Sequence, residues 1–135
     1  MTALLLLALI LTPDRAPGPD EWGYRPADKS IVEVNPPALT WIHEKGATGY
    51  DVQWSPGEDF VQATKVENVK WPVYTHHQTL TPGRYWWRYR IHGADGVSGW
   101  SKARSFAVPA TAVEFPKPTL EMLRRRVPKD HPRVF

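Results

Sequence analysis

The chemically most versatile side chains of this sequence fall on one predicted strand that follows Pro82-Gly83. Successive side chains of a strand point to opposite faces, so its even-numbered residues should share one face. Three guanidinium groups and one indole then lie together: Arg84, Trp86, Arg88 and Arg90. We expect Lys102 and Arg104 of the last predicted strand to extend this aromatic and cationic surface.

This surface has three candidate uses. A guanidinium group above an exposed indole contributes about 0.5–1 kcal/mol, so the surface can be a ladder that stabilises the domain itself. It can also be a contact with a second domain. In the third interpretation, the arginines bind sulfate or carboxylate groups of an acidic polysaccharide.

A second aromatic pair precedes the first predicted strand. Trp22 and Tyr24 lie within a segment that is otherwise irregular. We expect both rings to pack back onto the domain, and the alternative is an exposed pair that stacks on a sugar. The candidate residues for contact with a glycan or a second domain are therefore Trp22, Tyr24, Trp86, Arg88 and Arg90.

No set of residues predicts catalysis, a cofactor or a metal site. The adjacent His76 and His77 would point to opposite faces of a strand, and no His-x-x-x-His spacing accompanies them. The turn Ser98–Ser101 lacks the Gly-x-Ser-x-Gly spacing of a nucleophile elbow. Three acidic residues near one predicted strand are too sparse for a calcium loop: Asp51, Glu58 and Asp59. We therefore predict that this chain by itself is not an enzyme.

Composition narrows the class of protein further. The 135 residues allow one domain and include no cysteine, which excludes disulfides and thiolate zinc sites. Residues 116–135 carry six Lys or Arg against two acids, whereas residues 1–115 carry eleven against twelve. The net charge of +3 is thus +4 from the tail and −1 from the rest. A broadly basic surface for nucleic acid is not predicted.

Alternating hydrophobic residues predict an all-β fold. Tyr50, Val52 and Trp54 should point into a core, and Phe60 should turn back inward after the following turn. Further strands are expected at 31–34, 39–43, within 66–74 and at 100–108. About seven short strands within residues 31–109 predict an immunoglobulin-like or fibronectin-III-like β-sandwich. Three polar residues that alternate with the first set should face solvent: Asp51, Gln53 and Ser55.

The sharpest local signal is the stretch Leu80–Tyr85. Its Pro82-Gly83 pair favours a tight turn just before a strand. A tyrosine in this position is typical of a tyrosine corner, in which the ring enters the core and the hydroxyl bonds to nearby backbone. The inward face of the strand should continue through the alternate residues Tyr85, Trp87, Tyr89 and Ile91.

The two ends of the chain differ from its middle. Residues 3–11 are continuously apolar, which predicts a signal peptide over residues 1–16 and a secreted or periplasmic protein. Residues 17–30 read as an irregular lead-in. Beyond residue 110, Thr119 should cap a short helix whose apolar face includes Leu120, Leu123 and Val127. We interpret residues 110–135 as a linker and the start of a further domain.

The chain resembles two known families. Its middle resembles fibronectin type III domains through Pro37-x-x-x-Trp41, Leu80-x-Pro-Gly-x-Tyr85-x-Trp87-Arg88 and Gly99-Trp100-Ser101. A narrower pattern is similar to the N-terminal domain of heparinase II/III-type polysaccharide lyases. It comprises residues 21–26, residues 34–37, Phe115-Pro116-x-Pro118 and the ending Val127-Pro128-Lys129-Asp130-His131-Pro132-Arg133-Val134-Phe135.

The second resemblance implies a function for the parent protein. In that family the ending leads into an α/α-toroid, and the toroid and a later sandwich abstract a proton from a uronic acid. The chain would then be the non-catalytic N-terminal module of a secreted lyase. Its partners would be the catalytic domain of the same protein and an acidic polysaccharide, with no nucleic acid and no membrane after signal cleavage. The alternative is a standalone carbohydrate-binding or structural spacer module.

Overall fold

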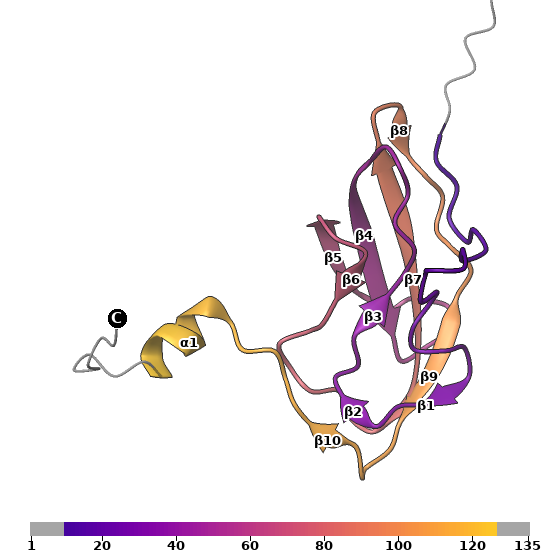
Figure 1. Ribbon diagram of the computed structural model, residues 1–135. Coiled ribbons are helices and arrows are strands. Elements are labelled where there is room, and N and C mark those ends of the chain that lie inside the picture. Colours follow the sequence, from indigo (N-terminus) through magenta and orange to yellow (C-terminus); the bar gives the residue numbers. More distant parts are fainter. Residues whose placement is uncertain (1–9, 127–135) are drawn as a thin grey trace, which may run out of the picture.

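The computed structural model describes residues 10–126, whose regular secondary structure consists of β-strands and one short helix (Figure 1). The main sheet has the strand order β1-β9-β7-β4-β5, with β8 paired to β7. Its strands are β1 (Ser30–Ile31), β4 (Ala47–Ser55), β5 (Thr64–Val69), β7 (Gly83–Gly93), β8 (Gly96–Val97) and β9 (Arg104–Val108). Two small ladders pair β2 (Val34–Asn35) with β10 (Val113–Glu114), and β3 (Leu39–Thr40) with β6 (Val73–Tyr74). The predicted all-β class with a short C-terminal helix, α1 (Leu120–Arg126), is confirmed.

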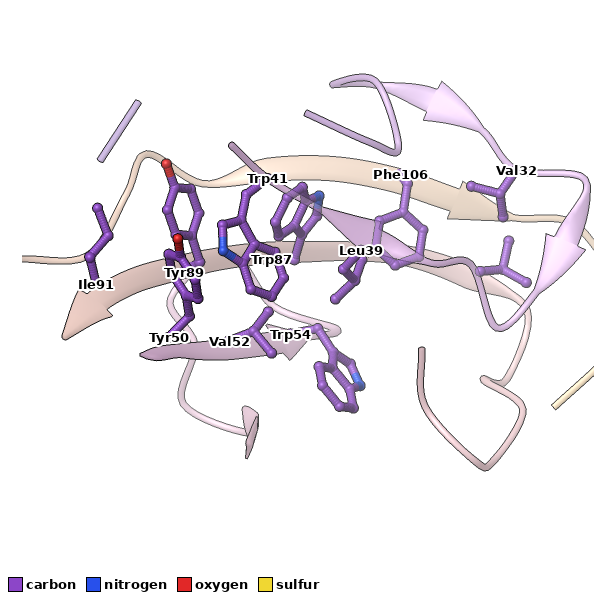
Figure 2. Packing of buried hydrophobic residues seen from close by; sticks show 11 residues of the cluster. Val32, Leu39, Trp41, Tyr50, Val52, Trp54, Trp87, Tyr89, Ile91 and Phe106 are labelled. Atoms are coloured by element: carbon purple, nitrogen blue, oxygen red, sulfur yellow. The ribbon is translucent and has the colours of Figure 1, made fainter. Parts of the chain in front are cut away.

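The hydrophobic core lies on one face of the main sheet (Figure 2). Trp41, which follows β3, covers this face, and its ring stacks on Tyr89 with a centroid distance of 5.5 Å and an interplanar angle of 16°. The β3–β6 ladder therefore packs against the main sheet. The alternation of β4, β7 and β9 supplies the rest of the core, as predicted: Tyr50, Val52, Trp54, Trp87, Tyr89, Ile91, Phe106 and Val108.

The predicted tyrosine corner is present. The Tyr85 hydroxyl donates a hydrogen bond of 2.6 Å to the carbonyl oxygen of Thr81, and the ring stacks on Phe106. The turn that begins β7 is thereby attached to the core.

The expected first strand at 31–34 is divided between two ladders. β1 runs parallel to β9 in the main sheet, whereas β2 runs parallel to β10. Val32 lies between them and is buried, and the chain crosses here from the main sheet to the β2–β10 ladder. The Asn35 side chain holds the crossing in place, because its amide donates to Leu80 O (2.7 Å) and accepts from Leu80 N (2.8 Å).

Two other expectations about the strands are wrong. Asp51, Gln53 and Ser55 are buried, with exposures of 1%, 8% and 0%, although their alternation predicted a solvent-facing side. Trp100 does not open the last strand, because β9 begins only at Arg104. The side chain of Trp100 instead packs on Arg88 and Arg90 at the outer face of β7.

The chain leaves the β-structure after β10. Thr119 caps α1 as expected, with Met122 N donating to its hydroxyl oxygen at 3.2 Å. α1 extends away from the strands (Figure 1), and none of its residues is buried. Val127, which was expected on its apolar face, lies outside the described residues together with the rest of the Val127–Phe135 ending. Within residues 10–126, no helix is long and apolar enough to cross a membrane.

Candidate functional site

The outer face of the main sheet, opposite the core, carries the predicted aromatic and cationic residues of β7. Strand register places Arg88 across from Gln53 and Arg90 across from Asp51 of β4. The Arg88 Nε donates a hydrogen bond to Gln53 Oε1. Arg90 Nε lies 2.7 Å from Asp51 Oδ2, in an ion pair whose carboxylate side chain is only 1% exposed. The arginines therefore cover the polar side chains that were expected to face solvent.

Two aromatic rings cover the arginines in turn. The Arg88 guanidinium carbon lies 4.0 Å from the ring centroid of Phe60 and 5.0 Å from that of Trp100. Arg90 lies 4.5 Å from the Trp100 ring. Phe60 thus turns back onto the outer face rather than into the core. These contacts support the ladder that stabilises the domain itself, since both guanidinium groups already have an anionic, amide or aromatic partner.

Asp51 anchors this outer layer. Burial opposes ionisation of its carboxyl group, but hydrogen bonds from Arg90, His92 and the Asn68 N–H outweigh burial and hold its pKa below the usual range. Asn68 N lies 3.1 Å from one carboxylate oxygen, and His92 Nε2 lies 2.8 Å from the same oxygen. The carboxylate therefore joins β4, β5 and β7.

The remaining members of the predicted surface are separated. Trp86 is half-buried on β7, between Ser55 of β4 and Ser105 of β9. Lys102 is exposed before β9. Arg104 was expected to extend the outer surface, and this is wrong: it pairs with Trp87 on the core-facing side and is only 4% exposed. Because Arg104 lies opposite the buried Trp87, the even-numbered residues of β9 face inward.

Arg104 binds the N-terminal segment. Its Nη2 lies 2.7 Å from Asp14 Oδ1, and the guanidinium carbon lies 3.7 Å from the ring centroid of Tyr24. Tyr24 also stacks on Tyr89 at a centroid distance of 6.0 Å. Tyr24 therefore packs back onto the domain as expected, and burial raises its pKa and that of Tyr89.

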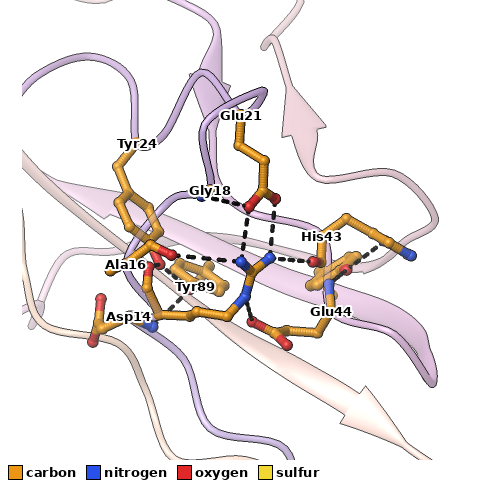
Figure 3. A network of polar contacts seen from close by, with 10 residues as sticks. Asp14, Ala16, Gly18, Glu21, Tyr24, His43, Glu44 and Tyr89 are labelled. Atoms are coloured by element: carbon orange, nitrogen blue, oxygen red, sulfur yellow. Dashed lines mark hydrogen bonds and ion pairs between the residues drawn. The ribbon is translucent and has the colours of Figure 1, made fainter.

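A second arginine, Arg15, bonds to the same segment and to Glu44 and His43, which Figure 3 shows close to Glu21. Arg15 donates to both carboxylate oxygens of Glu21 at 2.8 and 3.0 Å and to Glu44 at 2.9 Å. Its Nη2 also donates to the carbonyl oxygen of His43 at 3.0 Å. The hydrogen bonds from Arg15, with one from Gly18 N, hold the pKa of the Glu21 carboxyl at about 2. No sequence pattern indicated that Asp14 and Arg15 form ion pairs. The partner of Asp14 is far away in the chain, and the partners of Arg15 belong to no motif.

Trp22 is placed differently from its neighbour Tyr24. Its side chain is 84% exposed, so the expectation that it packs back onto the domain is wrong. It lies at the edge of a surface hollow of about 240 Å³ whose lining also includes Thr40, Ile42 and Pro72. Of the five candidate contact residues, Trp22 is thus the most accessible.

The described residues contain no group of three or more His, Asp or Glu side chains that could hold a metal ion. Asp59 accepts a hydrogen bond from Val61 N within its own turn, at 3.2 Å. His76 Nδ1 lies 3.0 Å from the Tyr74 hydroxyl, and burial, followed by the neighbouring His77, lowers its pKa. These polar groups interact locally and do not converge on a common point with the five candidate residues.

The comparisons with known proteins concern the fold. No family model matches the chain, and no curated protein matches it in sequence. Among solved structures, the chain is similar to the alpha-L-rhamnosidase from Dictyoglumus thermophilum, with a TM-score of 0.50 and 21% sequence identity. The similarity covers 62% of this chain and 11% of the rhamnosidase chain. A comparable β-rich unit thus occurs as a small part of a much longer chain.

Proposed function

We propose that this chain is a fibronectin-III-like β-sandwich module, without catalysis of its own, of a secreted heparinase II/III-like polysaccharide lyase. In this proposal the module packs against the catalytic toroid of the same protein and stabilises it. The acidic polysaccharide is then the substrate of the parent protein, and the described residues of the module contribute no reacting group.

The use of the polar residues supports a non-catalytic module. Arg88 and Arg90 are held by Gln53, Asp51 and the ring of Trp100. Arg104 and Arg15 are likewise paired with carboxylates of the N-terminal segment. A catalytic acid or base needs a free reacting atom at a cleft, whereas these groups join strands and segments to one another.

The observation that carries the proposal is the course of the chain after β9. Val113 N donates to Glu33 O at 2.8 Å and Phe115 N donates to Asn35 O at 2.9 Å, so the linker is attached to the β-structure at its start. It then leads to α1, in which Leu120 and Leu123 lie three positions apart on one face and are 63% and 44% exposed. An amphipathic helix normally buries such a face, and a following domain would cover it.

Two further observations agree with this proposal. The segment before α1 carries the Phe115-Pro116-x-Pro118 part of the lyase-like pattern, and the Val127–Phe135 ending follows α1. A fold match that covers 11% of a longer chain also fits a domain that normally belongs to a larger protein.

The proposal is tested by reading the gene beyond codon 135. We expect an open reading frame for a long helical domain, and a stop codon followed by unrelated sequence would contradict the proposal. The substitution Leu123→Asp then tests the interface. In the isolated chain it should change the free energy of unfolding by less than about 0.5 kcal/mol, because Leu123 is exposed there. In the full-length protein it should destabilise the catalytic domain, with Glu121→Gln on the same helix as the matched control.

A further inference from the structure

No contact within the described residues accounts for the exposure of the Trp22 indole. A tryptophan side chain that is 84% exposed leaves a large apolar surface in water, whereas the neighbouring Tyr24 is packed and hydrogen-bonded. The ring is carried by the segment between Gly18 and the Arg25–Thr40 bridge. Several contacts hold that segment in place, so the fold itself keeps the indole of Trp22 pointing away from the core.

Several contacts hold the segment around Trp22. Glu21, immediately before it, is bonded by Arg15 and by Gly18 N. Gly23, immediately after it, adopts a φ of 78° that side-chain-bearing residues rarely adopt. Arg25 and Thr40 exchange backbone hydrogen bonds of 2.9 and 2.8 Å. The indole is thus presented on an ordered backbone, which reduces the entropy lost when a ligand binds.

The ring lies beside a hollow with mixed chemistry. The Arg25–Thr40 bridge places Gly23 and Trp22 alongside the segment of Ile42 and His43. On the other side, Trp41 N donates to Pro72 O at 3.0 Å and brings Pro72 to the opposite rim. Ile42 is only 3% exposed within the lining of this hollow of about 240 Å³. An aromatic wall, an apolar floor and a few polar groups are the ordinary composition of a small-ligand site.

The polar groups of the hollow are suited to hydroxyl groups. Thr40 can donate and accept through its hydroxyl. His43 uses Nδ1 with the Tyr50 hydroxyl at 2.9 Å, and its Nε2 has no protein partner among the described residues. Glu21 offers carboxylate oxygens that already accept hydrogen bonds from Arg15. Hydrogen-bonding groups of this kind orient a ligand, whereas the indole supplies contact area.

The charges of the lining select the class of ligand. The lining contains one carboxylate, Glu21, and no lysine or arginine. Arg15 lies behind Glu21 and is shared with Glu44, so it has no remaining charge to offer an anion. Arg15 is one cation shared by two carboxylates, so this cluster keeps an excess negative charge, and a uronic acid or sulfated sugar would meet it with no lysine or arginine in the lining. We propose that the hollow beside Trp22 is a binding site for a neutral saccharide, whose pyranose ring stacks on the indole. This site does not depend on the parent being a lyase.

The test uses the whole chain and isothermal titration calorimetry with cellohexaose, xylohexaose and mannohexaose as neutral probes. We expect at least one of them to bind with a Kd of about 10⁻⁵ to 10⁻³ M. Trp22→Ala should weaken that binding by at least about tenfold, which is the order of loss expected for one stacked ring. Trp22→Phe should keep most of the affinity. Phe115→Ala removes a similarly exposed ring outside the hollow and should change the affinity by less than about twofold.

An acidic probe and a measurement of mass separate the other occupants. A heparin octasaccharide should bind the chain more weakly than the neutral probe, and that binding should not depend on Trp22 because it does not use the hollow. The chain should sediment as a monomer with or without Trp22→Ala. The proposal is overturned if no neutral hexasaccharide binds or if Trp22→Ala and Phe115→Ala weaken binding equally. Trp22-dependent binding of heparin that exceeds the neutral probe, or a dimer that Trp22→Ala abolishes, would also overturn it.

Discussion

The guanidinium group of Arg104 and the carboxylate of Asp14 lie 2.7 Å apart although 90 positions separate the two residues in the chain. The Asp14 carboxylate also accepts a hydrogen bond of 2.8 Å from Lys102 N. Because Arg104 is only 4% exposed, Asp14 is the partner that compensates a buried cation. This ion pair joins the segment before β1 to the start of β9.

Removing this partner should be costly. Asp14→Asn leaves the buried guanidinium of Arg104 without its anion, so we expect the free energy of unfolding to fall by about 2–4 kcal/mol in urea denaturation. The control is Glu121→Gln, which breaks an ion pair whose side chains are 77% and 73% exposed. That control should cost less than about 0.5 kcal/mol. Equal effects of the two substitutions would contradict the role given to Asp14.

The contacts of residues 11–15 also bear on the predicted boundary after Ala16. Leu11 packs against the core, Asp14 N donates to the Tyr89 hydroxyl at 2.9 Å, and Arg15 binds Glu21 and Glu44. A chain that begins at residue 17 should therefore be less stable in urea than one that begins at residue 10, and by more than Asp14→Asn alone. Equal midpoints for the two chains would show that this segment does not stabilise the fold.

Local patterns in the sequence were sufficient to predict which residues of β4 and β7 face the core. The inward sets of β4 and β7 follow from period-two alternation, and the contact of Tyr85 with Thr81 follows from a Pro-Gly turn with the tyrosine at its end. These features involve residues that are close in the chain. Their geometry is therefore set by backbone stereochemistry and by the burial of one face.

The outer face and the N-terminal segment could not be predicted in the same way. Asp51 looked solvent-facing because a strand pattern does not show that Arg90 and Trp100 will cover it. The residues next to Arg104 in the sequence do not indicate whether it faces inward or outward. Its ion-pair partner Asp14 is 90 positions away, so no local pattern shows that the buried cation is compensated. Trp22 and Tyr24 are two residues apart, yet only Tyr24 finds a ring and a cation to pack on.

The Glu21 carboxyl offers a test of the Arg15 network by pH titration. Its folded-state pKa of about 2 lies below the ordinary 4.5, because Arg15 donates to both of its oxygens. The carboxylate therefore stabilises the fold above pH 4.5, and this contribution is lost as the pH falls towards 2. Carbon-detected NMR should show that midpoint, and Arg15→Gln should return it towards 4.5. An unchanged midpoint in Arg15→Gln would assign the shift to another group.

Asp51 should be the most sensitive position of the outer layer. Asp51→Asn removes the charge that holds Arg90 and His92, and we expect a loss of about 2–3 kcal/mol in the free energy of unfolding. Glu67→Gln is the matched control, because the Lys65–Glu67 pair on β5 is exposed at 41% and 55%. It should cost at most about 1 kcal/mol. Since the pKa of Asp51 lies below its usual range, its contribution should persist at neutral pH and disappear only in acid.

The proposed role of this chain as a non-catalytic module of a larger uronate-cleaving protein can be assayed by product formation. Release of unsaturated uronate from alginate, heparin and chondroitin sulfate is followed by ultraviolet absorbance. We predict no release by the chain alone and release from at least one of these polysaccharides by the product of the extended gene. Release by the chain alone, or no release by the extended product from any of the three, would contradict this role.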